Sequence, residues 1–329
     1  MRSRVIMGIH GLGNKPPSRI LKTWWNKAIS EGLRQIQHPG VFFRLELVYW
    51  ADIFHPTPLN VHETDPKSSL FIEFPYATAT DFSEKPPGKW RRRVLDFLER
   101  QMDQIFLKKD KTPPFQSVTN LIIRHYFKDL DLYYSATVKD ENDQDVPARD
   151  VIKQRLIRML RKFQDKDILL IAHSMGSIIA YEVLCSLAQE LNIDTLVTIG
   201  SPLGQPLVMS KFLAEFFPNQ EDISKPGTPE NVKNQWFNLS DLGDHVAMNY
   251  NLADDYMENS AGIGPQDQVV FNNYVYQNKR NPHKSYGYLR TPEFAEIIYQ
   301  FLSRDRSKLG FWFANRYLEL TQKLFGDKQ

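Results

Sequence analysis

The sequence contains little cysteine, no long apolar run and almost no net charge. Cys185 is the only cysteine among 329 residues, so neither a disulfide nor a cysteine-based metal site can form within one chain. No apolar run reaches the roughly 18 residues of a membrane-spanning helix, and the stretch from Val5 to His10 is too short for a signal peptide. The formal net charge of +2 creates no strong field that would attract nucleic acid. We therefore expect a cytoplasmic protein that does not bind nucleic acid.

The apolar residues form short runs that alternate with helical patterns. Hydrophobic residues make up 42% of the chain, which is enough for a sizeable core. The runs predict strands at Val5–His10, Val41–Trp50, Asp167–Ala172, Thr195–Ile199, Trp236–Leu239 and Val269–Tyr276. Apolar spacing and cap residues predict helices at about 18–36, 147–164, 175–190, 292–303 and 309–325. This alternation indicates an α/β fold with a mostly parallel sheet and helices on both faces.

Residues 51–146 interrupt this alternation. Prolines crowd the region, and between them the apolar spacing predicts a helix at about 88–108 and a second helix at about 117–134. We expect a single domain, 1–329, in which residues 51–146 form a largely helical insertion after the second strand. Such an insertion is a candidate cap over a site on the core.

One turn carries the chemistry of the sequence. In the segment Ile168–Ala180 a buried strand runs directly into a helix, and Ser174 stands at the turn between them. A turn this sharp strains the backbone of its central residue and exposes its side chain above the sheet. Small residues are needed on both sides of such a turn, and Ala172 and Gly176 flank Ser174 at minus two and plus two. The pattern predicts that Ser174 is a catalytic nucleophile.

Three segments together resemble a known superfamily. The segment Ile171–Ser177 resembles the nucleophile elbow of lipases and serine esterases in the α/β-hydrolase superfamily, with alanine where glycine is usual. The His10–Gly13 turn resembles their oxyanion loop, and Thr198–Leu203 is similar to their next core strand and its exit. The resemblance covers most of the chain outside residues 51–146 and implies an α/β-hydrolase fold.

The resemblance also implies an oxyanion hole built from backbone N–H groups. Acyl transfer places negative charge on the former carbonyl oxygen, and two N–H groups are needed to stabilise it. One donor is expected from Met175, the residue after the nucleophile, and the other from Leu12 in the glycine turn. His173 is expected to pack or to hydrogen-bond beside the elbow, with its side chain directed away from that of Ser174.

In this superfamily the catalytic residues follow the chain order serine, acid, histidine. His245 and His283 are the two histidines after Ser174, and Asp241 and Asp244 are the candidate acids after the predicted strand that ends at residue 239. The acid loop of these esterases favours Asp244 and leaves Asp241 as the alternative. His283 is preferred to His245 because it follows a further predicted strand and lies in a polar loop before the last core helix.

These residues predict a serine hydrolase that cleaves an acyl ester through Ser174, His283 and Asp244. An acyltransferase or a thioesterase could use the same triad, and an inactive α/β-hydrolase acting as a binding protein is the alternative from another class. We expect no cofactor and no metal, because no metal-ligand motif occurs in the sequence. The expected substrate is a small-molecule or lipid ester. A basic run at residues 89–93 fits a solvated helix face better than a lid-like helix that meets anionic lipid, so membrane contact stays open but is not indicated. The acyl group and the oligomeric state stay open.

Overall fold

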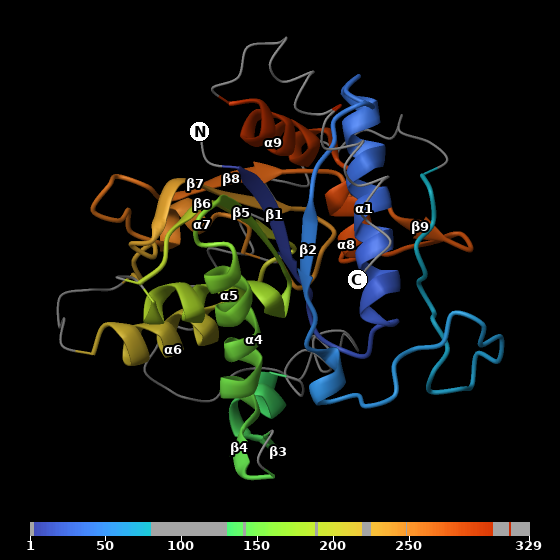
Figure 1. The fold of residues 1–329 in the computed structure, drawn as a ribbon, viewed down its shortest axis with the longest axis horizontal. Helices are drawn as coiled ribbons and strands as arrows, with labels where there is room; N and C mark the ends of the chain where they lie inside the picture. Colours follow the sequence, from blue (N-terminus) through green and yellow to red (C-terminus); the bar gives the residue numbers. More distant parts are fainter. Residues whose placement is uncertain are drawn as a thin grey trace.

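A computed structural model describes residues 3–79, 130–140, 143–187, 190–218, 225–247, 249–304 and residue 316. Its centre is a six-stranded sheet in the order β2-β1-β5-β6-β7-β8, and every neighbouring pair is parallel (Figure 1). The strands are β1 (Arg4–Ile9), β2 (Leu45–Val48), β5 (Asp167–His173), β6 (Ile193–Ile199), β7 (Val232–Ser240) and β8 (Pro265–Val269). The expected mostly parallel sheet is confirmed.

Helices cover both faces of this sheet (Figure 1). One face is covered by α4 (Ala148–Lys162), α5 (Met175–Ser186) and α6 (Pro206–Phe216), and the other by α1 (Ser18–Gln35), α8 (Ser285–Leu289) and α9 (Pro292–Ser303). Side chains of the central strands alternate between the two cores: in β5, Leu170 faces one core and Leu169 the other. A strand buried on both faces needs apolar residues at successive positions, which is why these runs are continuously hydrophobic.

Most core elements lie where the sequence predicts them. The helix predicted at 18–36 is α1, and the helix predicted at 292–303 is α9, whose N-cap Thr291 accepts a hydrogen bond from the Phe294 N–H. The second strand is shorter than expected, because only residues 45–48 pair with β1. The helix predicted at 309–325 lies outside the described residues except for residue 316.

The strand predicted at Val269–Tyr276 is wrong. The sheet is completed by β8, which ends at residue 269, while β9 (Val275–Tyr276) pairs with β10 (Lys279–Arg280) in a separate hairpin. Val270 and Tyr274 are buried although they lie in the loop between β8 and β9, so the apolar character of this stretch reflects loop packing. The edge strand itself is polar and half-buried, and it therefore carries no apolar run.

The described part of the insertion contains elements that the sequence did not predict. After a 3-10 turn at Ala51–Ile53 the chain up to residue 79 forms no helix or strand, and a hairpin of β3 (Thr137–Lys139) and β4 (Asp145–Pro147) precedes α4. Residues 130–135 are helical, which agrees with the end of the helix predicted at 117–134. The rest of that helix and the helix predicted at 88–108 lie outside the described residues.

A buried carboxylate anchors the chain where it returns from the insertion. Glu182 of α5 is fully buried and accepts hydrogen bonds from the hydroxyls of Tyr133 and Tyr134 at 2.7 and 2.6 Å. Arg149 of α4 donates its Nε–H to the same carboxylate at 2.8 Å. The helix that follows Ser174 is thereby tied to two other segments. None of the described helices is long and apolar enough to cross a membrane.

Candidate active site

Ser174 lies between β5 and α5, where the sequence places the turn. Its backbone has φ 55° and ψ −128°, in the left-handed region that residues other than glycine rarely adopt. The N–H of Ser174 donates to the Ile199 carbonyl at 3.1 Å, and the Ser177 hydroxyl donates to the Ser174 carbonyl. Ser177 in turn contacts the Ser201 hydroxyl at 2.8 Å. The strained turn is thus held from both sides by buried hydrogen bonds.

The small residues around the turn allow β1 to approach it closely. A Cβ on Gly176 would lie 2.7 Å from the Ile9 carbonyl oxygen and 2.9 Å from that of His10. A Cβ on Gly11 would lie 2.6 Å from the Ser174 Cβ. All three distances are shorter than real Cβ contacts, so a side chain at either glycine would push the end of β1 away from Ser174.

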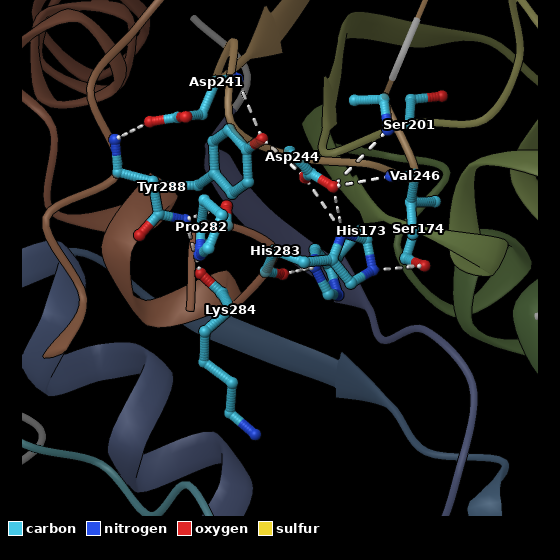
Figure 2. Close-up of polar contacts among 12 residues, drawn as sticks. His173, Ser174, Ser201, Asp241, Asp244, Val246, Pro282, His283, Lys284 and Tyr288 are labelled. Atoms are coloured by element: carbon cyan, nitrogen blue, oxygen red, sulfur yellow. Dashed lines mark hydrogen bonds and ion pairs between the residues drawn. The ribbon is translucent and has the colours of Figure 1, made fainter. Parts of the chain in front are cut away.

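His283 connects Ser174 to Asp244 (Figure 2). Its Nε2 lies 2.9 Å from Ser174 Oγ, and its Nδ1 lies 3.0 and 2.9 Å from the two carboxylate oxygens of Asp244. A carboxylate only accepts hydrogen bonds, so Nδ1 carries the proton and Nε2 accepts from the serine hydroxyl. This is the tautomer that a general base needs before it takes a proton from serine.

Asp244 is buried and is held by several donors. Burial by itself would raise the pKa of the Asp244 carboxyl, but the charge of His283 and hydrogen bonds from His283, Tyr288 and the Val246 backbone outweigh it and hold the pKa below its ordinary value. The Tyr288 hydroxyl donates at 2.7 Å and the Val246 N–H at 2.9 Å. The carboxylate therefore stays ionised beside His283 at neutral pH.

The two alternative residues have other surroundings. Asp241 accepts hydrogen bonds from Arg280 Nη2 at 2.6 Å, from the Asn272 N–H at 2.6 Å and from the Gly243 N–H at 2.7 Å. Its carboxylate is thus bound to these three donors and not to His283. Burial raises the pKa of Asp241, although Arg280 and the two N–H groups oppose the rise. His245 is exposed to solvent. Of the two candidate acids and the two candidate histidines, the structure brings Asp244 and His283 to Ser174.

The glycine turn after β1 is held by a neutral histidine. Burial lowers the pKa of His10 to about 3. Its Nε2 accepts from the Trp50 N–H at 3.0 Å, so its Nδ1–H donates to the Gly11 carbonyl at 2.8 Å. The Gly11 carbonyl and the Leu12 N–H belong to one planar trans peptide and point in opposite directions, so anchoring the carbonyl also orients the Leu12 N–H. The other expected donor, the Met175 N–H, belongs to the first residue of α5, directly after Ser174.

Comparison with known proteins places this site in a family. A family model described as the PGAP1-like alpha/beta domain matches residues 97–285, which is more than half of the chain and includes Ser174, Asp244 and His283. The chain belongs to the PGAP1-like alpha/beta domain family. The expected resemblance to the α/β-hydrolase superfamily is thereby confirmed, and hydrolase activity in general is supported.

The other two comparisons add little to this assignment. The search of curated proteins gives no match for the PGAP1-like chain. A solved structure from Xanthomonas campestris pv. campestris, assigned to the hydrolases of the alpha/beta superfamily, is similar at 10% identity. The match covers 91% of this chain and 99% of that one with a TM-score of 0.35, which is too low to carry an argument.

His173 and Gly200 of the PGAP1-like site lie against the proposed catalytic residues. His173 Nε2–H donates to the His283 carbonyl at 2.8 Å, and burial holds the pKa of His173 well below its ordinary value. Gly200 has φ +54°, and a Cβ there would lie 2.9 Å from Asp244 Oδ2 and 3.3 Å from His283 Nδ1. Tyr288 was not predicted, because no local pattern in the sequence distinguishes it from other buried tyrosines.

The described residues contain no group of three or more histidine, cysteine, aspartate or glutamate side chains arranged to hold a metal ion. Asp244, His283 and Ser174 form one hydrogen-bonded chain, and Tyr288 also donates to Asp244. The chemistry that this arrangement can perform is proton transfer from the Ser174 hydroxyl.

Proposed function

We propose that this PGAP1-like protein is a serine hydrolase that cleaves a carboxylic ester, with Ser174 as nucleophile, His283 as general base and Asp244 as the acid that orients His283. The observation that carries this proposal is the position of one imidazole: Nε2 is 2.9 Å from Ser174 Oγ, and Nδ1 is 2.9 Å from Asp244 Oδ2. Both distances fall within hydrogen-bond reach for a serine activated by a histidine.

The proposed reaction has two halves. Ser174 Oγ attacks the acyl carbonyl carbon while His283 Nε2 takes the hydroxyl proton, and the imidazolium then donates that proton to the departing alkoxide oxygen. The ester C–O bond breaks and an acyl-enzyme forms. Water then attacks the acyl carbonyl carbon while His283 Nε2 takes a proton from it. The bond to Ser174 Oγ breaks, the proton returns to Ser174, and the carboxylic acid product leaves. The buried Asp244 carboxylate stabilises the imidazolium in both halves.

We propose that Leu12 and Met175 donate their N–H groups to the oxyanion. The Met175 N–H belongs to the first turn of α5, where the helix dipole favours negative charge. The Leu12 N–H follows Gly11, where an added Cβ would lie 2.6 Å from Ser174 Cβ, and it is oriented through the hydrogen bond from His10 to the Gly11 carbonyl. Such preorganised donors contribute about 3 kcal/mol each to transition-state stabilisation.

We propose that residues 51–146 form a cap next to this site. Two anchors of the described part support this. Asn14, two residues after the proposed oxyanion donor Leu12, donates to the Thr57 carbonyl at 2.9 Å. Tyr274, which precedes the loop of His283, donates its hydroxyl to the Pro75 carbonyl. A segment held beside both loops can form one wall of a pocket for a small-molecule or lipid ester. The cytoplasmic location is also a proposal, which the single cysteine supports.

An active-site fluorophosphonate probe tests the proposed nucleophile. We expect wild-type protein to be labelled, Ser174→Ala to lose the label, and the exposed Ser210→Ala to keep it. A wild-type protein that is not labelled, or a Ser174→Ala variant that is labelled equally well, contradicts the proposal and favours a binding protein without activity.

The rates of two histidine variants test the proposed base. His283→Ala should reduce kcat for a p-nitrophenyl ester by about 1000-fold or more, since the base is lost, whereas the exposed His245→Ala should retain wild-type activity. Loss of activity in His245→Ala alone would overturn the assignment. Esters of different chain length, the matching thioesters and added alcohol acceptors then separate an esterase from a thioesterase or an acyltransferase.

A further inference from the structure

Tyr288 lies between the two aspartates of the acid loop (Figure 2). It belongs to α8, and its side chain is fully buried. The hydroxyl oxygen accepts the backbone N–H of Asp241 at 2.9 Å, and the hydroxyl proton is donated to Asp244 Oδ2 at 2.7 Å. Since the first contact uses an oxygen lone pair and the second uses the proton, the two contacts fix the direction of the O–H bond.

The two carboxylate oxygens of Asp244 depend on different donors. Oδ1 accepts the backbone N–H groups of Val246 at 2.9 Å and Ala247 at 3.4 Å in addition to His283. Among the described residues, the donors to Oδ2 are His283 at 2.9 Å and Tyr288. Tyr288 is therefore the contact that holds Oδ2 independently of the histidine that Asp244 has to orient.

We infer that Tyr288 is a positioning residue, which acts through Asp244 and sets the orientation of His283 toward Ser174. This inference rests on the proposed function, because it assigns a role in the same triad.

The ring of Tyr288 is itself firmly seated. The Thr291 hydroxyl donates to the Tyr288 carbonyl at 2.9 Å, at the junction of α8 and α9. On the other side the ring edge lies against Gly200, where an added Cβ would come within 3.0 Å of Tyr288 Cε2. Because its backbone and ring are already fixed in the folded protein, Tyr288 can hold the Asp244 carboxylate in one orientation without further ordering of its own side chain.

Burial and the charged groups on the neighbouring segments keep the Tyr288 hydroxyl protonated, so it remains the hydrogen-bond donor to Asp244. Burial, together with the charges of Asp244 and Asp241, raises the pKa of Tyr288 well above its ordinary value, so its hydroxyl keeps its proton at neutral pH. The carboxylate of Asp241 is paired with Arg280 at 2.6 Å. His173 on β5 packs beside His283, and Lys15 and Lys284 lie near enough to His173 to influence its charge.

The variant Tyr288→Phe removes the hydroxyl and keeps the ring. Kinetics on a p-nitrophenyl ester should show kcat reduced by about tenfold with KM within about twofold, because hydrogen bonds to charged groups are worth more than neutral ones and this bond positions the base without touching substrate. The carboxylate anion is less stabilised without Tyr288, so the Asp244–His283 unit binds a proton at higher pH. The acidic limb of the kcat/KM profile should therefore move to higher pH.

The matched control is Tyr181→Phe. Tyr181 on α5 is equally buried and loses a hydrogen bond of similar length, from its hydroxyl to the Gly227 carbonyl at 2.6 Å, away from the triad. Tyr288→Phe also leaves the Asp241 N–H without its acceptor, so the thermal stability of the control should fall by no more than that of Tyr288→Phe, while its kcat and pH profile should match those of wild type.

The double variant with Asp244→Asn separates positioning from general destabilisation. If Tyr288 acts through Asp244, then adding Tyr288→Phe to Asp244→Asn should lower the residual rate by less than about twofold. A tenfold loss of rate on adding Tyr288→Phe to Asp244→Asn would overturn the inference. So would a Tyr288→Phe variant with wild-type kcat and an unmoved acidic limb of the kcat/KM profile. In either case, labelling of Ser174 in the wild-type protein would leave the proposed function intact. Wild-type protein that is neither labelled nor active would overturn both.

Discussion

Replacing Gly11 by alanine adds one methyl group at the most crowded point of the proposed site. The added Cβ would lie 2.6 Å from the Ser174 Cβ and 3.1 Å from Ser174 Oγ. Non-bonded carbon atoms prefer a separation of about 3.5 to 4.0 Å. The turn after β1 must therefore retreat from Ser174 by about 1 Å, because the strained elbow is held by its own hydrogen bonds to Ile199 and Ser177.

The retreat of this turn carries the Leu12 N–H with it. If that N–H is an oxyanion donor, a displacement of about 1 Å is expected to cost roughly 100-fold in kcat, in the range found for misplaced groups and lost oxyanion donors. KM should change little, since the contact is made mainly in the transition state. Overpacking of a dense region also costs about 1–3 kcal/mol of unfolding free energy.

Steady-state kinetics on a p-nitrophenyl ester and urea unfolding measure the two effects separately. The control is Gly13→Ala in the same turn, where the nearest atom to an added Cβ is the Lys15 amine at 3.8 Å but φ is +78°. That variant should lose about 1 kcal/mol of stability from the left-handed backbone and keep most of its kcat. A folded Gly11→Ala protein with wild-type kcat would refute the reasoning, because it would mean that the approach of this turn to Ser174 does not matter for the reaction.

Two further predictions concern stability. The neutral state of His10, with a folded pKa of about 3 against 6.5 for the free side chain, contributes stability that is complete above pH 6.5 and is lost as the pH falls toward 3. The unfolding free energy should therefore fall by up to about 1.4 kcal/mol per pH unit through His10 alone, and His10→Asn should flatten that slope in urea titrations at about pH 7 and about pH 5. Arg149→Ala leaves the buried Glu182 without its cation and should cost about 3 kcal/mol in urea unfolding; an unchanged midpoint would contradict this.

Strong local patterns explain why much of the fold could be predicted. The strand that ends at His173 and the helix α9 behind Thr291 depend on continuous apolar runs or cap residues that act within a few positions. The edge strand β8 escaped prediction because Pro265–Val269 is polar and half-buried, and its pairing with β7 is decided by the sheet. The apolar loop at Val270 and Tyr274 suggested a strand because burial in a loop and burial in a strand leave the same composition.

The sequence by itself determined the elbow. Ser174 follows a buried strand and precedes a helix with small residues beside it, and that local chemistry selects a strained turn wherever the segment lies. The serine–acid–histidine order that the resemblance implies, together with the predicted strand that ends at residue 239, also narrowed the acid to Asp241 or Asp244 and the base to His245 or His283.

Tertiary structure decided what surrounds the elbow. Which aspartate reaches His283 depends on loops after different strands that meet at the carboxyl edge of the sheet, and the chain order carries no such distance information. Asp241 is turned to Arg280 and Asp244 to His283, and Tyr288 links the two aspartates. Each aspartate bonds a partner 39 residues further along the chain, so the sequence separation is the same for both pairs. Only the close packing of the folded chain gives one of these partners access to Ser174.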